Sequence, residues 1–205
     1  MSRVVLPADA DTVAGALADI QHRRAYVEAL VATMEALPTP EPERYGDHDA
    51  WYLVALQDGL FRRVFVVEYR AWRSRIRDLV RDQLSAQGLD SDLWRPVEEA
   101  RDAAAFVFQV RLLFAEELEC DLGSEVWDGL QELAAVAEAI AESSRAARLE
   151  LAERHPDYFS DLDVFGDGDP TGRLTLSHDL ARRAFGFATA FWSALPYEAV
   201  AAAEA

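Results

Sequence analysis

A row of arginines is the feature of this sequence with the most direct binding chemistry. Residues 62–81 contain seven arginines against Glu68 and Asp78, a net charge of +5. Spacings of 8, 3, 4 and 4 residues place five of the seven on one side of a helix. The five residues of this arginine ridge are Arg62, Arg70, Arg73, Arg77 and Arg81. Such a ridge could bind a phosphate, a nucleic acid or an acidic protein partner.

An acidic segment offers the arginine ridge a partner within the same chain. Residues 98–142 hold twelve acids against Arg101 and Arg111, a net charge of −10. Basic and acidic helices that lie side by side can pair along their exposed edges, where each ion pair contributes about 0–1 kcal/mol. The ridge is therefore predicted either to pair internally or to dock a protein.

Glu68 differs from the other charged residues of its segment because it falls on the apolar side of the helix. Spacings of 3 and 4 residues place it between Phe65 and Trp72. An unpaired buried carboxylate is costly, so we expect a cationic partner or a bound proton. Arg111 and Arg24 are the candidate partners. A structural ion pair is the first interpretation, and a cleft carboxylate with a shifted pKa is the alternative.

Metal and cofactor motifs are absent from the sequence. Four histidines form no His-x₃-His or Glu-x-x-His pair, and Cys120 alone cannot build a structural zinc site. The aspartates of residues 161–169 lack the glutamate that closes a calcium-binding loop, so they are predicted to form turns. No phosphate-binding glycine motif is present. We therefore predict neither a metal nor a cofactor.

A short arginine–histidine pattern is the strongest indication of an enzyme. The residues are Arg173-Leu-Thr-Leu-Ser-His178, near the start of the last predicted helix. The pattern resembles the motif of HEPN-type ribonucleases, which are small helical bundles. The resemblance implies metal-independent RNA cleavage across a dimer interface, in which Arg173 would bind the scissile phosphate and His178 would promote attack by the 2′-hydroxyl. It covers six of 205 residues, and Leu174 stands where the family commonly has a polar residue.

Two groups of carboxylates form a further pattern. Glu98, Glu99 and Asp102 are followed after 22 residues by Glu125 and Asp128. The arrangement resembles the magnesium site of all-α nucleotide pyrophosphohydrolases, with Asp102 in place of a glutamate. One continuous helix over residues 97–119 would place Glu98 about 30 Å from the turn before Glu125, at about 1.5 Å per residue. One ion could not bridge that distance, so this assignment requires a broken helix.

Helices must position all of these residues, because apolar residues recur every three or four positions and strand patterns are missing. We predict an all-α, single-domain bundle of five or six helices over residues 1–205, with frayed ends at about 1–8 and 197–205. Its central helix, at about 96–119, is apolar nearly all round. The other predicted helices cover about residues 9–36, 49–87 with a bend near Gly59, 125–154 and 174–195.

The overall composition restricts the classes of function. The 205 residues carry a net charge of −17, which disfavours binding to nucleic acid. All twenty basic residues are arginine, for which a GC-rich genome and a salt-loving host are alternative explanations. No apolar run is long enough for a membrane helix, the first residues do not resemble a signal peptide, and the single cysteine favours the cytoplasm.

These features favour a non-enzymatic binding protein, of the adaptor, immunity or chaperone type. It would dock a protein partner through its acidic faces or its arginine ridge, and a homodimer is also possible. The ribonuclease and the magnesium-dependent pyrophosphohydrolase are the two enzyme alternatives.

Overall fold

The computed structural model describes residues 10–36, 47–86, 91–118, 120–141, 145–160 and 173–196. Most of these residues are helical, and their only strands are one antiparallel pair of two residues each, β1 (Phe159–Ser160) and β2 (Arg173–Leu174), which confirms the all-α class. The helices are α1 (Ala10–Glu35), α3 (Asp47–Ala86), α4 (Arg95–Glu98), α5 (Ala103–Leu112), α6 (Ser124–Ala141), α7 (Arg145–Arg154) and α8 (His178–Ala194). Shorter turns are η1 (Ser91–Trp94) and η3 (Pro156–Tyr158), both 3₁₀, and the π-helical η2 (Leu113–Glu117).

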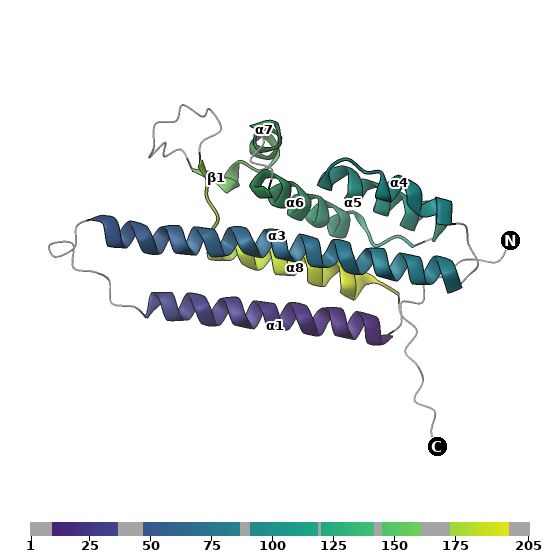
Figure 1. Ribbon diagram of the computed structural model, residues 1–205, viewed down its shortest axis with the longest axis horizontal. Helices are drawn as coiled ribbons and strands as arrows, with labels where there is room; N and C mark the ends of the chain where they lie inside the picture. The colour runs from purple at the N-terminus through teal and green to yellow at the C-terminus, as the bar shows by residue number, and fades with distance from the viewer. Residues whose placement is uncertain are drawn as a thin grey trace, which may run out of the picture.

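Helix α8 connects the layers of the bundle. It packs against α1, α3 and α6. Figure 1 shows α1 and α3 lying lengthwise with opposite chain directions, α8 alongside both, and α4 to α7 on the other side of α3 from α1. The alanines among the buried residues of α8 let its neighbours approach closely. These buried residues are Ala181, Ala184, Phe185, Ala188, Phe191 and Trp192.

Phe191 of α8 is the centre of an aromatic cluster that joins four elements. Its ring is fully buried and lies 5.3–5.9 Å, centroid to centroid, from four other aromatic rings. Three of these contacts are edge-on, the geometry that aromatic pairs favour. The four rings are Trp72 of α3, Phe114 of η2, Trp127 of α6 and Trp192 of α8.

The predicted central helix over residues 96–119 is wrong as a single element. Its first turn is α4, and a new helix, α5, starts after a break at residues 99–102. Asp102 has extended backbone angles, and its carboxylate accepts a hydrogen bond from Ala105 N at 2.6 Å. It is therefore an N-cap, which satisfies a free amide at the start of α5. Phe108 of α5 is 48% exposed, so neighbours do not enclose this helix on all sides.

Two other predicted helices also have different boundaries. The helix predicted over residues 125–154 is two helices, because α7 packs against α6 and crosses it in Figure 1 instead of extending it. The last helix begins at His178, where Ser177 accepts a hydrogen bond from Leu180 N. The bend predicted near Gly59 does not interrupt α3. The aspartates of residues 161–169 and the predicted frayed ends lie outside the described residues.

Candidate functional site

Glu68 is buried with a cationic partner, as predicted, but the partner is Arg23. The Glu68 residue is 1% exposed, and Arg23 Nε and Nη2 donate to its two carboxylate oxygens at 2.5 and 2.8 Å. The predicted partners are wrong: Arg24 Nε lies 4.0 Å from Glu28 Oε1 at the surface, and Arg111 lies on α5. One residue along a helix turns a side chain by about 100°, which places Arg23, and not Arg24, opposite α3.

The Arg23–Glu68 pair connects α1 to α3 in apolar surroundings. Ala16, Ile20 and Trp192 surround it, and the hydrogen bond to Glu68 raises the pKa of Arg23. The guanidinium therefore stays charged and neutralises the carboxylate. This geometry agrees with the structural interpretation of the pair, in which it holds two helices together.

Two members of the arginine ridge are bound within the chain. Arg62 Nε donates to Asp58 Oδ2 at 2.7 Å, and its Nη2 donates to the carbonyl oxygen of Leu174. Arg81 Nη2 donates to Glu98 Oε1 at 2.7 Å. These contacts connect α3 to β2 and to α4. Part of the ridge therefore pairs with neighbouring elements, which is the first of the two predicted roles.

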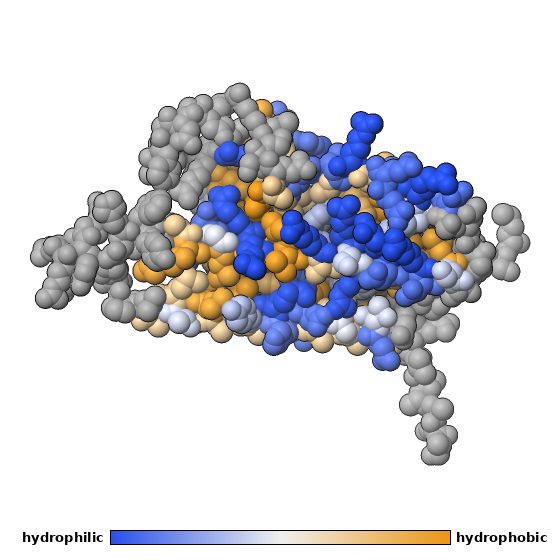
Figure 2. All heavy atoms as spheres, in the orientation of Figure 1, coloured by the Kyte–Doolittle hydropathy of each residue, from blue (hydrophilic) through white to orange (hydrophobic). Residues whose placement is uncertain are grey.

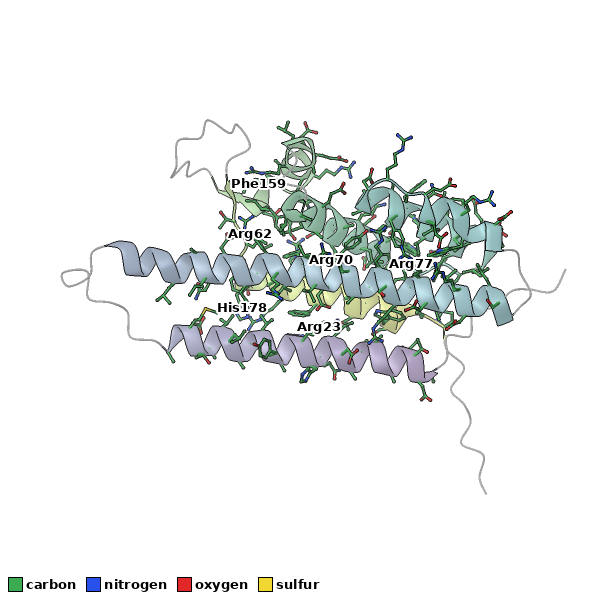
Figure 3. All side chains as sticks on the ribbon, in the orientation of Figure 1. Arg23, Arg62, Arg70, Arg77, Phe159 and His178 are labelled. Atoms are coloured by element: carbon green, nitrogen blue, oxygen red, sulfur yellow. The ribbon has the colours of Figure 1, made fainter. Side chains whose placement is uncertain are left out.

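The middle of the ridge faces the layer of α4 to α7. Figure 3 shows Arg62, Arg70 and Arg77 on the side of α3 that is turned toward this layer. The guanidinium carbon of Arg73 lies 4.5 Å from the ring centroid of Phe106 on α5, a cation–π distance. Arg70 is exposed and Arg77 is half-buried. Docking of a protein partner by these arginines stays a prediction.

His178 of the ribonuclease-like motif is held by contacts to α1 and α3. Its Nε2 lies 2.9 Å from Glu28 Oε2, and its ring stacks on Phe61 with centroids 5.8 Å apart. Arg182 donates to both oxygens of Glu28 at 2.8 and 2.9 Å, which lowers the pKa of Glu28. The side chain of Arg173 lies outside the described residues, so the ribonuclease assignment stays a prediction.

The structure does not bring the carboxylates of the proposed magnesium site together. Asp102, Glu125 and Asp128 line one pocket, but Ala103 N, next to Asp102, donates to Glu138, which lies about 20 Å along α6 from Glu125. Glu98 points elsewhere, to Arg81, and Glu99 is not part of the lining. Within the described ranges, no three His, Cys, Asp or Glu side chains are close enough to hold a metal ion. The broken helix that this assignment requires is present, but the carboxylates remain divided.

The pocket that contains these three carboxylates has a volume of about 950 Å³ and lies between α5, α6 and α7. Along each helix its lining residues recur at spacings of three or four, so one face of each helix borders it. We call it the acidic groove. Its described lining holds six carboxylates and one arginine: Asp102, Glu125, Asp128, Glu132, Glu138, Glu150 and Arg154.

Glu132 at the edge of the acidic groove is buried and already neutralised. Tyr158 donates its hydroxyl to Glu132 Oε1 at 2.5 Å, and Arg183 Nη2 lies 2.6 Å from the same oxygen. His155 Nδ1 lies 3.8 Å from the other oxygen. Burial and the bond to Glu132 raise the pKa of Tyr158, so its hydroxyl remains a donor. This network fixes η3 and α8 onto α6.

The outer end of the groove carries carboxylates without such partners. Glu125 and Asp128 are exposed, and no salt bridge joins them to any other described side chain. Phe108 belongs to the same lining, and 48% of its surface is exposed. Charged and apolar side chains thus occur together here. Figure 2 shows the same mixture on the face it presents, where hydrophobic side chains are exposed between hydrophilic ones.

Gly129 allows the ring of Phe187 to lie against the floor of the groove. A Cβ atom at position 129 would lie 2.5 Å from Cδ1 of Phe187, so Gly129→Ala must displace that ring. Overpacking of this kind costs about 1–3 kcal/mol, more than the roughly 1 kcal/mol that alanine gains over glycine in a helix. We expect a net loss of stability in urea unfolding.

Gly186→Ala on α8 is the matched control for this substitution, because nothing lies within 4 Å of the added Cβ. It should stabilise the protein by about 0.5–1 kcal/mol. Equal stabilisation by both alanines would show that the contact between Gly129 and Phe187 is absent in solution.

Comparison of the chain with protein-family models, with curated proteins and with solved structures found no match. No activity of a relative can therefore be carried over to this chain.

In the part of the chain that the structure covers, no helix combines the length and the apolar character needed to cross a membrane.

Proposed function

We propose that this protein binds a partner protein by accepting a basic amphipathic helix in the acidic groove. The observation that carries this proposal is the exposed ring of Phe108, which shares a pocket of about 950 Å³ with the carboxylates of Glu125 and Asp128. An exposed aromatic ring in a concave site is a typical anchor of a protein interface. The neighbouring carboxylates select the charge of the occupant.

The shape of the groove favours a helix as the occupant. Its floor follows one face of α6 from Glu125 to Glu138, which is about 20 Å at about 1.5 Å per residue. Helix α5 forms one wall and α7 the other. Amphipathic helices bind such grooves through apolar residues at every third or fourth position. Phe108, Phe187 and Leu151 offer apolar surface for these contacts.

The charge of the groove requires a basic occupant. Six carboxylates face one arginine in the described lining, and two of the carboxylates, Glu125 and Asp128, are unpaired among the described residues. Lysines or arginines on both sides of an apolar stripe would meet these carboxylates as the apolar residues reach Phe108. Exposed charges are screened by salt, so the interaction should weaken as ionic strength rises. The same carboxylates repel nucleic acid.

A labelled helical peptide of leucine and lysine tests the proposal by fluorescence anisotropy. The double variant Glu125→Lys/Asp128→Lys should weaken binding by at least about tenfold, since two attractions become repulsions. Phe108→Ala should weaken it by a similar factor, because an interface anchor costs about 2 kcal/mol or more when truncated. Binding should decrease between low and physiological salt.

The control variant is Asp78→Lys/Asp82→Lys, which makes the same charge change at exposed positions of α3 outside the groove. It should bind the peptide nearly as well as the wild type. Equal weakening by both double variants would reduce the interaction to net charge and overturn the proposal. Self-association that only the groove variant abolishes would identify a second copy of this chain as the occupant instead.

A further inference from the structure

A second, smaller pocket lies between α3, the start of α5 and α6. Its volume is about 170 Å³, and three arginines line it. Arg70 and Arg73 come from the arginine ridge, and Arg101 comes from the break between α4 and α5. Arg101 lies in the break between α4 and α5, outside the segment of the arginine ridge. The spacing pattern of residues 62–81 therefore did not include it. We call this site the arginine pocket.

The two carboxylates of the arginine pocket are already used as acceptors. Asp102 accepts a hydrogen bond from Ala105 N at 2.6 Å, and Glu138 accepts one from Ala103 N at 3.1 Å. Both bonds satisfy amides at the start of α5, where a helix favours negative charge. Burial raises the pKa of Tyr69, which also lines the pocket, to about 12, so its hydroxyl adds no negative charge.

The arginines of the pocket have unused donors. Arg70 and Arg101 are exposed, and no ion pair joins either of them to the described side chains. Arg73 is held over the ring of Phe106, and its buried Nε has no hydrogen-bond partner in the described structure. A buried donor without an acceptor is costly, so an anionic oxygen at this place would be stabilised. Three arginines thus line one small pocket, and the buried Nε of Arg73 is a donor without an acceptor among the described residues.

We propose that the arginine pocket binds a phosphate group, either free or as a phosphomonoester. Each guanidinium group presents paired donors that match the oxygens of phosphate. A bound phosphate dianion carries more negative charge than a bound carboxylate, so three arginines stabilise the phosphate more. A ligand larger than a phosphate group would not fit inside this pocket, and its remainder would have to extend out of the pocket.

Calorimetric titration with inorganic phosphate at pH 7.5 and constant ionic strength tests this site. Arg70→Gln and Arg101→Gln should each weaken binding by about tenfold, because each removes a charge-assisted donor. Because both residues are exposed, the two variants should unfold at the same midpoint as the wild type in phosphate-free buffer. The matched control is Arg63→Gln, an exposed arginine of α3 outside the pocket, which should bind phosphate as the wild type does.

Phenyl phosphate and a phosphodiester separate the possible sources of the phosphate group. Tighter binding of phenyl phosphate than of inorganic phosphate identifies a monoester ligand, and equal binding identifies free phosphate. A preference for the diester would contradict the proposal. So would the lack of saturable phosphate binding to the wild-type protein, or an equal loss in Arg63→Gln. Arg101→Gln should leave binding of the basic peptide intact, so this inference can fail while the proposed groove function holds.

Discussion

Replacing Arg23 with methionine is expected to lower the free energy of unfolding by about 3–5 kcal/mol, because it leaves Glu68 buried without a cation. Glu68 is 1% exposed, and both of its oxygens accept hydrogen bonds from Arg23. No other described side chain donates a hydrogen bond to Glu68, and Ile20 and Trp192 line the site of the pair. Urea unfolding at pH 7, followed by circular dichroism, measures the loss.

Arg24→Met is the control for this substitution, since Arg24 is a largely exposed neighbour on the same helix. It should change stability by no more than about 0.5 kcal/mol. The double variant Arg23→Met/Glu68→Met should recover most of the stability, because apolar residues of similar size can replace a buried ion pair. An equal loss from Arg23→Met and Arg24→Met would contradict the assignment of the pair.

The helices of this protein were predictable where one apolar face governs them. Val13, Ile20 and Val27 recur every seven residues on one side of α1, and all three are buried. Arg23 and Arg24 lie three and four residues after Ile20, so both border this face. The error arose because a long arginine chain can reach around a helix, so spacing alone leaves two neighbouring positions open.

The break before α5 was the feature that periodicity concealed. An apolar pattern continues across residues 96–119, but Asp102 followed by Ala103 is also an N-cap signature. The hydrogen bond that the Asp102 carboxylate accepts from Ala105 N shows that this residue is an N-cap. Both pockets depend on this one residue, because the break positions Arg101 for one of them and Asp102 for both.

The acidic groove itself could not be predicted from the sequence. Its lining combines faces of α5, α6 and α7 with Phe187 of α8, and the angles between these helices arise from tertiary packing. The sequence showed that residues 62–81 are basic and that residues 98–142 are acidic. The structure shows which of the arginines are paired. Some arginines pair across helices, as Arg81 does with Glu98, while Arg70 and Arg101 face a pocket. Pairing within the chain, the first predicted role of the ridge, thus applies to Arg62 and Arg81, and docking of a protein by the ridge stays a prediction.

Phe191→Ala is expected to lower the free energy of unfolding by about 3–5 kcal/mol, the usual cost of a large cavity in an aromatic core. The Phe191 ring touches Trp72, Phe114, Trp127 and Trp192, so its removal loosens α8 from α3, η2 and α6 together. Chemical denaturation followed by tryptophan fluorescence measures the loss, because three of the four neighbours are tryptophans.

Phe108→Ala removes the same side chain from a site that is 48% exposed, and it should cost no more than about 1 kcal/mol. Phe191→Leu, which fills most of the volume, should lose less than Phe191→Ala does. These three variants separate the roles of the two phenylalanines, since Phe191 holds the bundle together and Phe108 is free to bind. A loss from Phe108→Ala as large as that from Phe191→Ala would mean that Phe108 is a core residue. The acidic groove would then lack its apolar anchor.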